Sequence, residues 1–283
     1  MGESVLCSLF SPCGSHLLCA TSFGWIHTWK LVYTGPSPLP RLTSSFRAHA
    51  AALYALVFVN RGGKQLVFSG SEEEIRCWDF EHILAASNGN IRPLVTLHTP
   101  RQEQRRGALG QLTDTAAFSF DPVSGLLFSA AGDGNAYGWD LVKLTATATL
   151  QGEGEPLYCV ATRPHHSQAS LEAMTSGCTR VLTGGEESLV RVWDVRSCKS
   201  EHKLRPDWAP LAPSAATGAG GSGRGFGEVS CLATVSAPHP QVKGLCGEQC
   251  TQVGLRVHIR SMLGSRVKKS RGSESAMTAL FSG

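Results

Sequence analysis

Apolar residues in this chain come in short runs of five to eight, and Gly-rich or acidic turns separate the runs. Polar and apolar residues also alternate. Between residues 189 and 193 the alternation places Leu189, Arg191 and Trp193 on one side of a strand and Val190 and Val192 on the other. This pattern predicts short β-strands joined by tight turns and argues against a helix bundle.

One unit recurs four times along the chain. It consists of an apolar run, a turn, a second apolar run that ends in a small residue, a Gly or acidic turn, and a strand that ends in Trp. In the fourth unit the predicted strands are Leu157–Thr162, Arg180–Thr183, Leu189–Val195 and Glu201–Leu204. Because one such sheet cannot cover both of its own faces, we expect successive sheets to stack around a common axis as an all-β propeller.

The residues of these units resemble the WD-repeat family over about Val5 to Pro206. The resemblance implies a hydrogen-bond chain in each blade. It runs from a Trp on the third strand, through a Ser or Thr on the second strand and a His before the first strand, to an Asp in the turn between the second and third strands. The matching residues are Trp29, Trp78, Trp139 and Trp193 for the Trp, Ser69, Ser129 and Thr183 for the Ser or Thr, His49 for the His, and Asp133 for the Asp.

These repeats are degenerate. The third and fourth units lack a Gly-His pair before them, and Glu stands in the second and fourth turns where the family has Asp. Within the WD-repeat proteins, the segments Ser11–Gly14, Leu182–Arg196 and Val229–Thr234 are similar to the THO complex subunit 6 family. That family belongs to the THO and TREX assemblies, which couple transcription to messenger-RNA export.

This second resemblance implies a nuclear scaffold whose partners are other THO subunits. It implies at most an indirect contact with RNA, and no cofactor, small-molecule substrate or membrane. The family's propeller has seven blades, and only four complete units are legible here, in residues 1–206.

The remainder of the chain divides into three parts. Residues 207–228 have the composition of a Gly/Pro/Ser-rich linker, residues 229–236 predict one strand of a fifth blade, and residues 237–283 predict a basic, poorly structured tail without Trp. Seven blades need roughly 300 residues at about 40–45 residues each. We therefore expect an incomplete ring. We also hypothesise that the tail arises from alternative splicing, a frameshift or an erroneous gene model.

Composition and charge refine this interpretation. The chain is 42% hydrophobic and 17% charged, which indicates a globular protein, and its net charge of +4 comes from the C-terminal part. A near-neutral body does not favour an extended nucleic-acid surface. The basic run from Arg266 to Arg271 is either a nuclear localisation signal or a solvated tail. Ten cysteines without an export signal indicate a reducing compartment, with Cys7, Cys19, Cys77 and Cys159 in apolar runs.

The sequence predicts no catalytic, cofactor-binding or metal-ligating residue. It contains no nucleophile elbow, no zinc-protease helix motif and no phosphate loop. Gly218–Gly223 fits G-x-G-x-x-G but has no flanking strand and helix, so a linker is the better interpretation. Cys246, Cys250 and His258 lack a clear fourth ligand for zinc.

Two groups of Arg residues are candidate partner contacts. Arg101, Arg105 and Arg106 lie in a long insert that is either a rim contact or a solvated loop. Arg196 completes a Trp-Asp-x-Arg sequence, which is similar to the adaptor-binding motif of substrate receptors of cullin-RING ubiquitin ligases. This receptor function is the alternative to the scaffold. A simpler interpretation is that Arg196 caps its strand.

Overall fold

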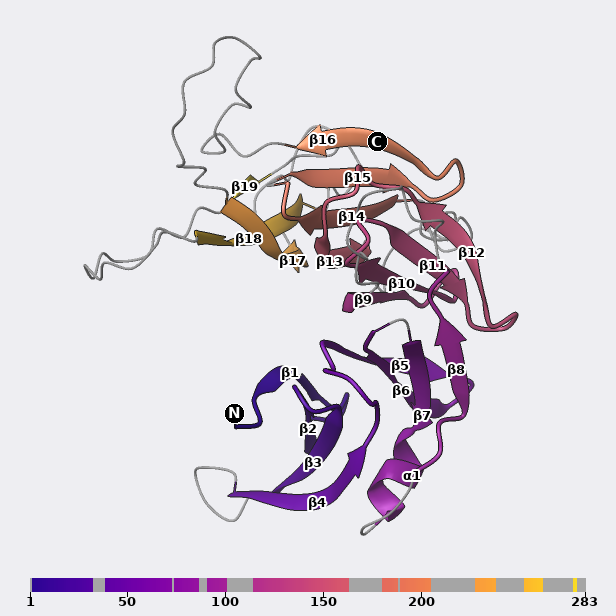
Figure 1. Ribbon diagram of the computed structural model, residues 1–283, viewed down its shortest axis with the longest axis vertical. Coiled ribbons are helices and arrows are strands. Elements are labelled where there is room, and N and C mark those ends of the chain that lie inside the picture. The colour runs from indigo at the N-terminus through magenta and orange to yellow at the C-terminus, as the bar shows by residue number, and fades with distance from the viewer. Residues whose placement is uncertain are drawn as a thin grey trace, which may run out of the picture.

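The computed structural model describes residues 2–32, 39–72, 74–86, 91–100, 114–162, 180–187 and 189–204. It also describes the backbone of three later strands, at 227–237, 252–261 and 277–278. The strands form four four-stranded antiparallel sheets and one three-stranded sheet. The sheets follow one another along an arc, as the blades of a propeller do (Figure 1). The expected all-β propeller architecture, with four blades and a partial fifth, is confirmed. The described residues form an open arc and no closed ring.

Each complete sheet is a meander of four consecutive strands. The first contains β1 (Val5–Phe10), β2 (His16–Thr21), β3 (Trp25–Val32) and β4 (Leu39–Arg47). The second contains β5 (Ala55–Arg61), β6 (Lys64–Gly70), β7 (Glu74–Asp79) and β8 (Val95–His98). The third contains β9 (Thr115–Asp121), β10 (Leu126–Ala131), β11 (Ala136–Asp140) and β12 (Thr145–Leu150).

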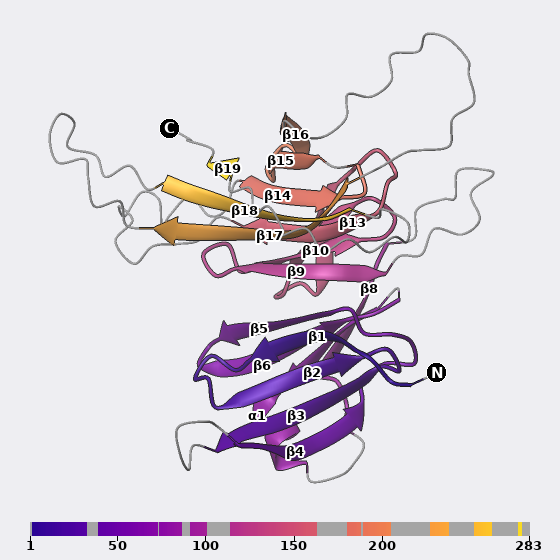
Figure 2. The same cartoon turned by 90° about the vertical axis from the view of Figure 1, so that its left-hand side faces the viewer.

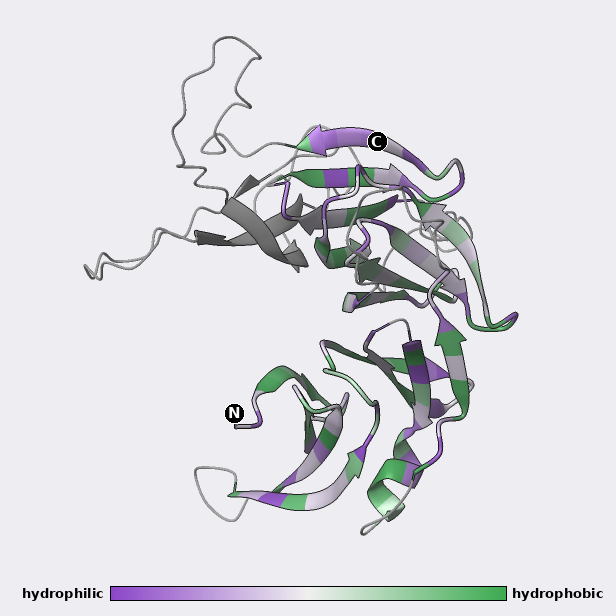
Figure 3. Ribbon diagram, viewed as in Figure 1, coloured by the Kyte–Doolittle hydropathy of each residue, from purple (hydrophilic) through white to green (hydrophobic). Residues whose placement is uncertain are grey.

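The fourth sheet contains β13 (Leu157–Thr162), β14 (Arg180–Gly185), β15 (Val190–Asp194) and β16 (Lys199–Leu204). All four strands predicted for this unit are present, and their ends differ from the prediction by at most two residues, as is usual where strands fray into turns. In Figure 1 the first strand of each sheet lines the inside of the arc and the fourth strand lies on the outside. The outer strand β16 is largely hydrophilic (Figure 3).

The core lies between the sheets. One apolar cluster joins the first sheet to the second, another joins the second to the third, and a third joins the third to the fourth. In each cluster the Trp of the later sheet packs on the sheet before it. Trp78, for example, meets Phe46 of β4 edge-on, with 5.0 Å between the ring centroids. This order of packing leaves the first sheet without a described sheet in front of it.

A single helix, α1 (Phe80–Ala85), occurs among the described residues. Asp79 caps its first turn by accepting a hydrogen bond from the backbone N–H of Glu81 at 3.0 Å. Phe80 and Ile83 are buried in the cluster between the first and second sheets, so the helix seals the outer edge of that interface. No described helix has the length and apolar character that crossing a membrane requires.

The fifth sheet contains β17 (Gly227–Ala237), β18 (Gln252–Ser261) and β19 (Met277–Thr278). The single strand predicted at 229–236 lies within β17, which runs beside β13 and β14 (Figure 2). The sequence predicts no strand after residue 237, because the later segment has no Trp-Asp pair to mark a blade. The predicted linker at 207–228 falls almost entirely outside the described residues.

Candidate functional site

In three sheets a buried Trp donates its indole N–H to a hydroxyl on the neighbouring strand. The donor–acceptor distances are 2.8 Å for Trp78 to Ser69, 2.9 Å for Trp139 to Ser129, and 2.8 Å for Trp193 to Thr183. A buried indole N–H needs an acceptor, and a hydroxyl two positions along the paired strand supplies one. In the first sheet this hydroxyl position is Cys19, and its Trp29 is only half-buried.

The position of each Trp in its sheet is the same. The residues that pair directly with Trp29, Trp78, Trp139 and Trp193 on the second strand are Leu17, Val67, Leu127 and Val181. The exposed fractions of the four Trp side chains differ, however. Three of these Trp residues are 1–2% exposed, whereas Trp29 has no described sheet to cover it.

A second contact, between a side chain on the third strand and a carboxylate, recurs in each of the four sheets. The residue that faces the hydroxyl or thiol across the second and third strands is His27, Arg76, Tyr137 and Arg191 in turn. Each of these four side chains reaches a carboxylate. The carboxylates are Glu3 for His27, Glu74 for Arg76, Asp133 for Tyr137, and Glu187 for Arg191. In the last three sheets the carboxylate lies two or four residues before its partner, so the contact recurs from blade to blade.

The second sheet also holds the imidazole that the WD-repeat resemblance implies. His49 Nε2 lies 2.8 Å from Ser69 Oγ, and His49 Nδ1 lies 4.0 Å from Glu74 Oε2. Glu74 therefore occupies the place of the family's Asp. Burial of the ring, together with the nearby positive charge of Arg76, lowers the pKa of His49 to about 4. His49 is thus neutral in the folded protein at neutral pH.

We expect the stability of the protein to depend on pH through His49. The unfolded chain takes up a proton near pH 6.5 and folded His49 takes one up only near pH 4, so the unfolded state binds more protons in between. The free energy of unfolding should therefore fall as the pH drops from 6.5 to 4, by about 3 kcal/mol. Urea denaturation at a series of pH values measures this fall.

The matched variants are His49→Gln and His98→Gln, since His98 is exposed. His49→Gln should remove most of the pH dependence in this window, and His98→Gln should leave it unchanged. A wild-type stability that stays flat between pH 6.5 and 4 would contradict the assignment.

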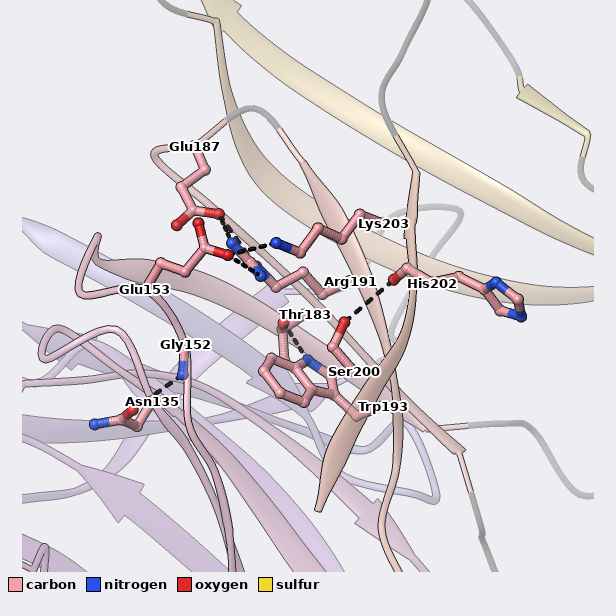
Figure 4. A network of polar contacts seen from close by, with 10 residues as sticks. All are labelled: Asn135, Gly152, Glu153, Thr183, Glu187, Arg191, Trp193, Ser200, His202 and Lys203. Carbon is pink, nitrogen blue, oxygen red and sulfur yellow. Dashed lines mark hydrogen bonds and ion pairs between the residues drawn. The ribbon is translucent and has the colours of Figure 1, made fainter. Parts of the chain in front are cut away.

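In the fourth sheet the arginine that faces Thr183 holds two carboxylates (Figure 4). The side chain of Arg191 is only 5% exposed and contacts Glu187 in the turn and Glu153 in the loop before β13, the latter at 3.2 Å. Lys203 on β16 also contacts Glu153. The hydrogen bonds from Arg191 and Lys203 lower the pKa of Glu153 to about 2.

Sequence analysis did not assign roles to Tyr137 and Arg191. In the third sheet the Tyr137 hydroxyl donates to Asp133 Oδ2 at 2.5 Å, and the two residues are buried. The sequence did indicate a buried position for Arg191, because the alternation of residues 189–193 places it on the same side of the strand as Trp193. A charged residue on the buried side of a strand needs a partner, and its partner Glu153 is 38 residues away in the sequence.

Exposed charges are unevenly divided between the two ends of the arc, although Arg47 and Lys203 lie among the carboxylates at one end and Glu81 among the cations at the other. The end that holds the turns between second and third strands carries Glu3, Glu72, Glu153, Glu155 and Glu186. The opposite end carries Lys30, Lys64, Arg92, Lys143, Arg196 and Lys199. We call these the acidic end and the basic end. Loops on a rigid sheet framework at both ends are suited to binding other macromolecules.

Two acidic residues lie on paired backbone segments on the acidic end, at the junction of the second and third sheets. Glu72 and Asp114 form an isolated antiparallel bridge, and burial followed by the charge of Glu72 raises the pKa of Asp114. Oδ1 of Asp114 and the hydroxyl of Thr115 are buried without a hydrogen-bond partner. This junction therefore offers acceptors that a cationic side chain could satisfy.

Of the Arg residues that the sequence suggests as partner contacts, one lies among the described residues and three lie outside them. Arg196 is exposed on the basic end, and its backbone N–H donates to Asp194 Oδ1 at 3.1 Å in the turn after β15. Arg101, Arg105 and Arg106 lie outside the described residues, and so do Gly218–Gly223, Cys246 and Cys250. His258 belongs to β18, which is described by its backbone.

The pKa values of the cysteine thiols depend on their burial and hydrogen bonding. All six described cysteines are free thiols, and the four in apolar runs are buried or partly buried. Burial raises the pKa of Cys77 to about 12, whereas hydrogen bonds from Ser11 and Ser15 lower the pKa of exposed Cys13 to about 7. Among the described residues no group of three or more His, Cys, Asp and Glu side chains could hold a metal ion.

Comparison with known proteins gives one consistent result. No protein-family model matches the chain. The chain is 29% identical to THO complex subunit 6 of Arabidopsis thaliana over 54% of its own length and 40% of that protein. It is 25% identical to the Homo sapiens protein of the same name and 27% identical to the Rattus norvegicus homologue, each over 67% of its own length and 50% of theirs. The chain thus spans about half the length of the curated relatives it matches.

Proposed function

We propose that this chain, a relative of the THO complex subunit 6 proteins, is a non-catalytic scaffold subunit of a THO/TREX assembly. It would act in the nucleus, in messenger-RNA processing and export, through contacts with other THO subunits. The similarity to proteins of that name supports the proposal. The described residues add a framework of stacked sheets whose two ends differ in their balance of exposed charge, which is typical of a binding protein.

The observation that carries the proposal is the junction of Glu72 and Asp114. The two backbones form a bridge across the blade boundary, burial and then the charge of Glu72 raise the pKa of Asp114, and the unpaired polar atoms of Asp114 and Thr115 remain buried. A Lys or Arg side chain from a partner would relieve both costs. We therefore propose that a basic segment of a protein partner binds the acidic end.

The sequence-predicted Arg residues extend this proposal. Arg101, Arg105 and Arg106 in their insert would contact other subunits, whereas Arg196 on the basic end is the partner contact that the alternative receptor function requires. Any contact with RNA would pass through these subunits. No finding favours the alternative function as a cullin-RING substrate receptor, so Arg196→Ala should leave the recovery of THO subunits intact.

Affinity purification of the tagged full chain from cells tests the proposal. THO subunits should co-purify, and the double variant Glu72→Lys/Asp114→Lys should lower their recovery at least about 10-fold, because reversing charges that face a buried cation costs several kcal/mol. Quantitative mass spectrometry gives the recovery. The matched control is Glu81→Lys on the opposite end, where an exposed carboxylate is reversed without effect on the junction.

Two results would contradict the proposal. If no THO subunit co-purifies with the wild-type chain, the scaffold function is wrong. If THO subunits co-purify equally with the wild type and the junction variant, the acidic end is not the binding face.

A further inference from the structure

A groove lies on the basic end, where the first and second sheets meet. Its volume is about 420 Å³, which falls within the range of small-molecule sites. We call it the basic-end groove. It is lined by the turn between β1 and β2, by the start of β6, and by α1 with its capping residue: Cys13, Ser15, His16, Gly63, Lys64, Gln65, Asp79, Phe80, Glu81 and Leu84.

The basic-end groove combines an apolar interior with a charged rim. Phe80 is 3% exposed and meets the ring of His16 edge-on, with 5.8 Å between the ring centroids. Lys64 from β6 and Glu81 from α1 are both exposed. A small ligand that carries charges of both signs is therefore complementary to this rim.

A hydrogen-bonded thiol lines the same groove. Cys13 Sγ lies 2.9 Å from Ser15 Oγ and 3.4 Å from Ser11 Oγ. The Ser11 hydroxyl accepts a hydrogen bond from the backbone N–H of His16 at 3.0 Å, so its own proton is free to point at the sulfur. Ser15 Oγ lies 2.8 Å from His16 Nδ1, and the tautomer with a proton on Nδ1 lets Ser15 donate to the sulfur as well. These donors stabilise a thiolate.

The thiol of Cys13 differs from the thiols buried between the sheets. Burial raises the pKa of Cys7, Cys19 and Cys77, which keeps these three residues protonated. Cys13 is exposed, and its pKa of about 7 leaves about half of its side chains as thiolate at neutral pH. The thiolate is the attacking group in disulfide exchange, and a thiol whose pKa lies near the ambient pH attacks most effectively.

We propose that the basic-end groove binds glutathione disulfide and that Cys13 exchanges with it to form a reversible mixed disulfide with glutathione. The charges of glutathione suit the rim, because Lys64 can pair with one of its carboxylates and Glu81 with its ammonium group. This modification site goes beyond the scaffold function and does not depend on it.

The exchange needs no other reactant. The thiolate of Cys13 attacks one sulfur of glutathione disulfide, and a bond forms between Cys13 Sγ and that sulfur. The original sulfur–sulfur bond breaks, and the second half leaves as a thiolate that takes up the proton given up by Cys13. Cys13 is thereby oxidised and one glutathione is released in its reduced form. Reduced glutathione reverses the reaction.

The rate of modification at each cysteine of the purified full chain tests this inference. The chain is incubated with glutathione disulfide at pH 7, the reaction is stopped with acid, and mass spectrometry of peptides locates the adducts. Cys13 should react at least about 10-fold faster in the folded chain than in the urea-unfolded chain, since the greater thiolate fraction alone gives about 5-fold. Cys13→Ser should remove this fast adduct. Equal rates in the folded and unfolded chains would overturn the inference.

A second disulfide separates binding in the groove from the reactivity of the thiol. The measured quantity is the ratio of the rate at Cys13 with glutathione disulfide to the rate with uncharged 2-hydroxyethyl disulfide. Lys64→Ala should lower this ratio about 3-fold, because only the charged disulfide pairs with the ammonium group. The matched control is Lys30→Ala, an exposed cation beside His16 that does not line the groove, and it should leave the ratio unchanged.

Both lysines are exposed, so the variants should fold, and circular dichroism verifies this. If Lys64→Ala leaves the ratio unchanged, or Lys30→Ala lowers it equally, the groove does not recognise glutathione and the inference is wrong.

Discussion

Replacing Trp139 with Ala should lower the free energy of unfolding by about 4 kcal/mol, whereas the same change at Trp29 should lower it by about 1 kcal/mol. Trp139 is 2% exposed and packs on the second sheet, and its indole N–H donates to Ser129. Truncation would open a cavity between two sheets and leave a buried hydroxyl with one partner fewer. Trp29 is half-buried and packs on no neighbouring sheet among the described residues, so its removal leaves no enclosed cavity there.

Urea denaturation followed by circular dichroism measures both changes. If Trp139→Ala does not fold, the milder pair Trp139→Phe and Trp29→Phe keeps the comparison. The first substitution removes the bond to Ser129 and should still cost more than the second. Equal losses at the two positions would mean that the Trp residues do not follow the packing order of the blades.

Replacing Arg191 with Met should lower the free energy of unfolding by about 3 kcal/mol. Met has a similar length and keeps the apolar contacts of the Arg stem. The loss in the free energy of unfolding therefore measures the contribution of the charged guanidinium group. Without the guanidinium, the carboxylate of Glu187 remains largely buried beside no cation in the turn. Although burial disfavours the charge on Arg191, its bonds to Glu153 and Glu187 raise its pKa, which indicates a net favourable interaction.

Arg180→Met is the matched control in the same sheet. Arg180 pairs with Glu201 at 2.9 Å, but its side chain is 56% exposed, so the loss should stay below about 1 kcal/mol. The variant Glu187→Gln should be destabilised nearly as much as Arg191→Met, because it removes the negative partner of a buried cation. Equal effects of Arg191→Met and Arg180→Met would show that the network in Figure 4 contributes no more than a surface ion pair.

The blades were predictable because their signals are local. Alternation over five residues defines a strand, a Gly or acidic turn defines its end, and the Trp lies about ten residues after its hydroxyl partner in each of the last three units. The pairing of Trp78 with Ser69, and the equivalent bonds in the third and fourth sheets, therefore follow from a fixed spacing within one hairpin. His49 was also identifiable, because the Ala-His pair stands at a set distance before its sheet.

The contacts of the residues that face the hydroxyls were not predictable in this way. Tyr137 and Arg191 fill the same place with different chemistry, and neither matches a family motif. The acidic junction likewise joins Glu72 and Asp114, which belong to different blades. The strand β18 was missed because it lacks the Trp-Asp pair by which the other units were recognised.

The sequence by itself determined the all-β class, the four meanders and the hydrogen bonds within each hairpin, because these depend on residues a few positions apart. Tertiary structure decided which faces are covered and which carboxylates meet which cations. Those contacts depend on how one sheet stacks on the next. For that reason Trp29 and Trp139 occupy the same place in their repeats and yet differ in burial, and only the stacking order explains the difference.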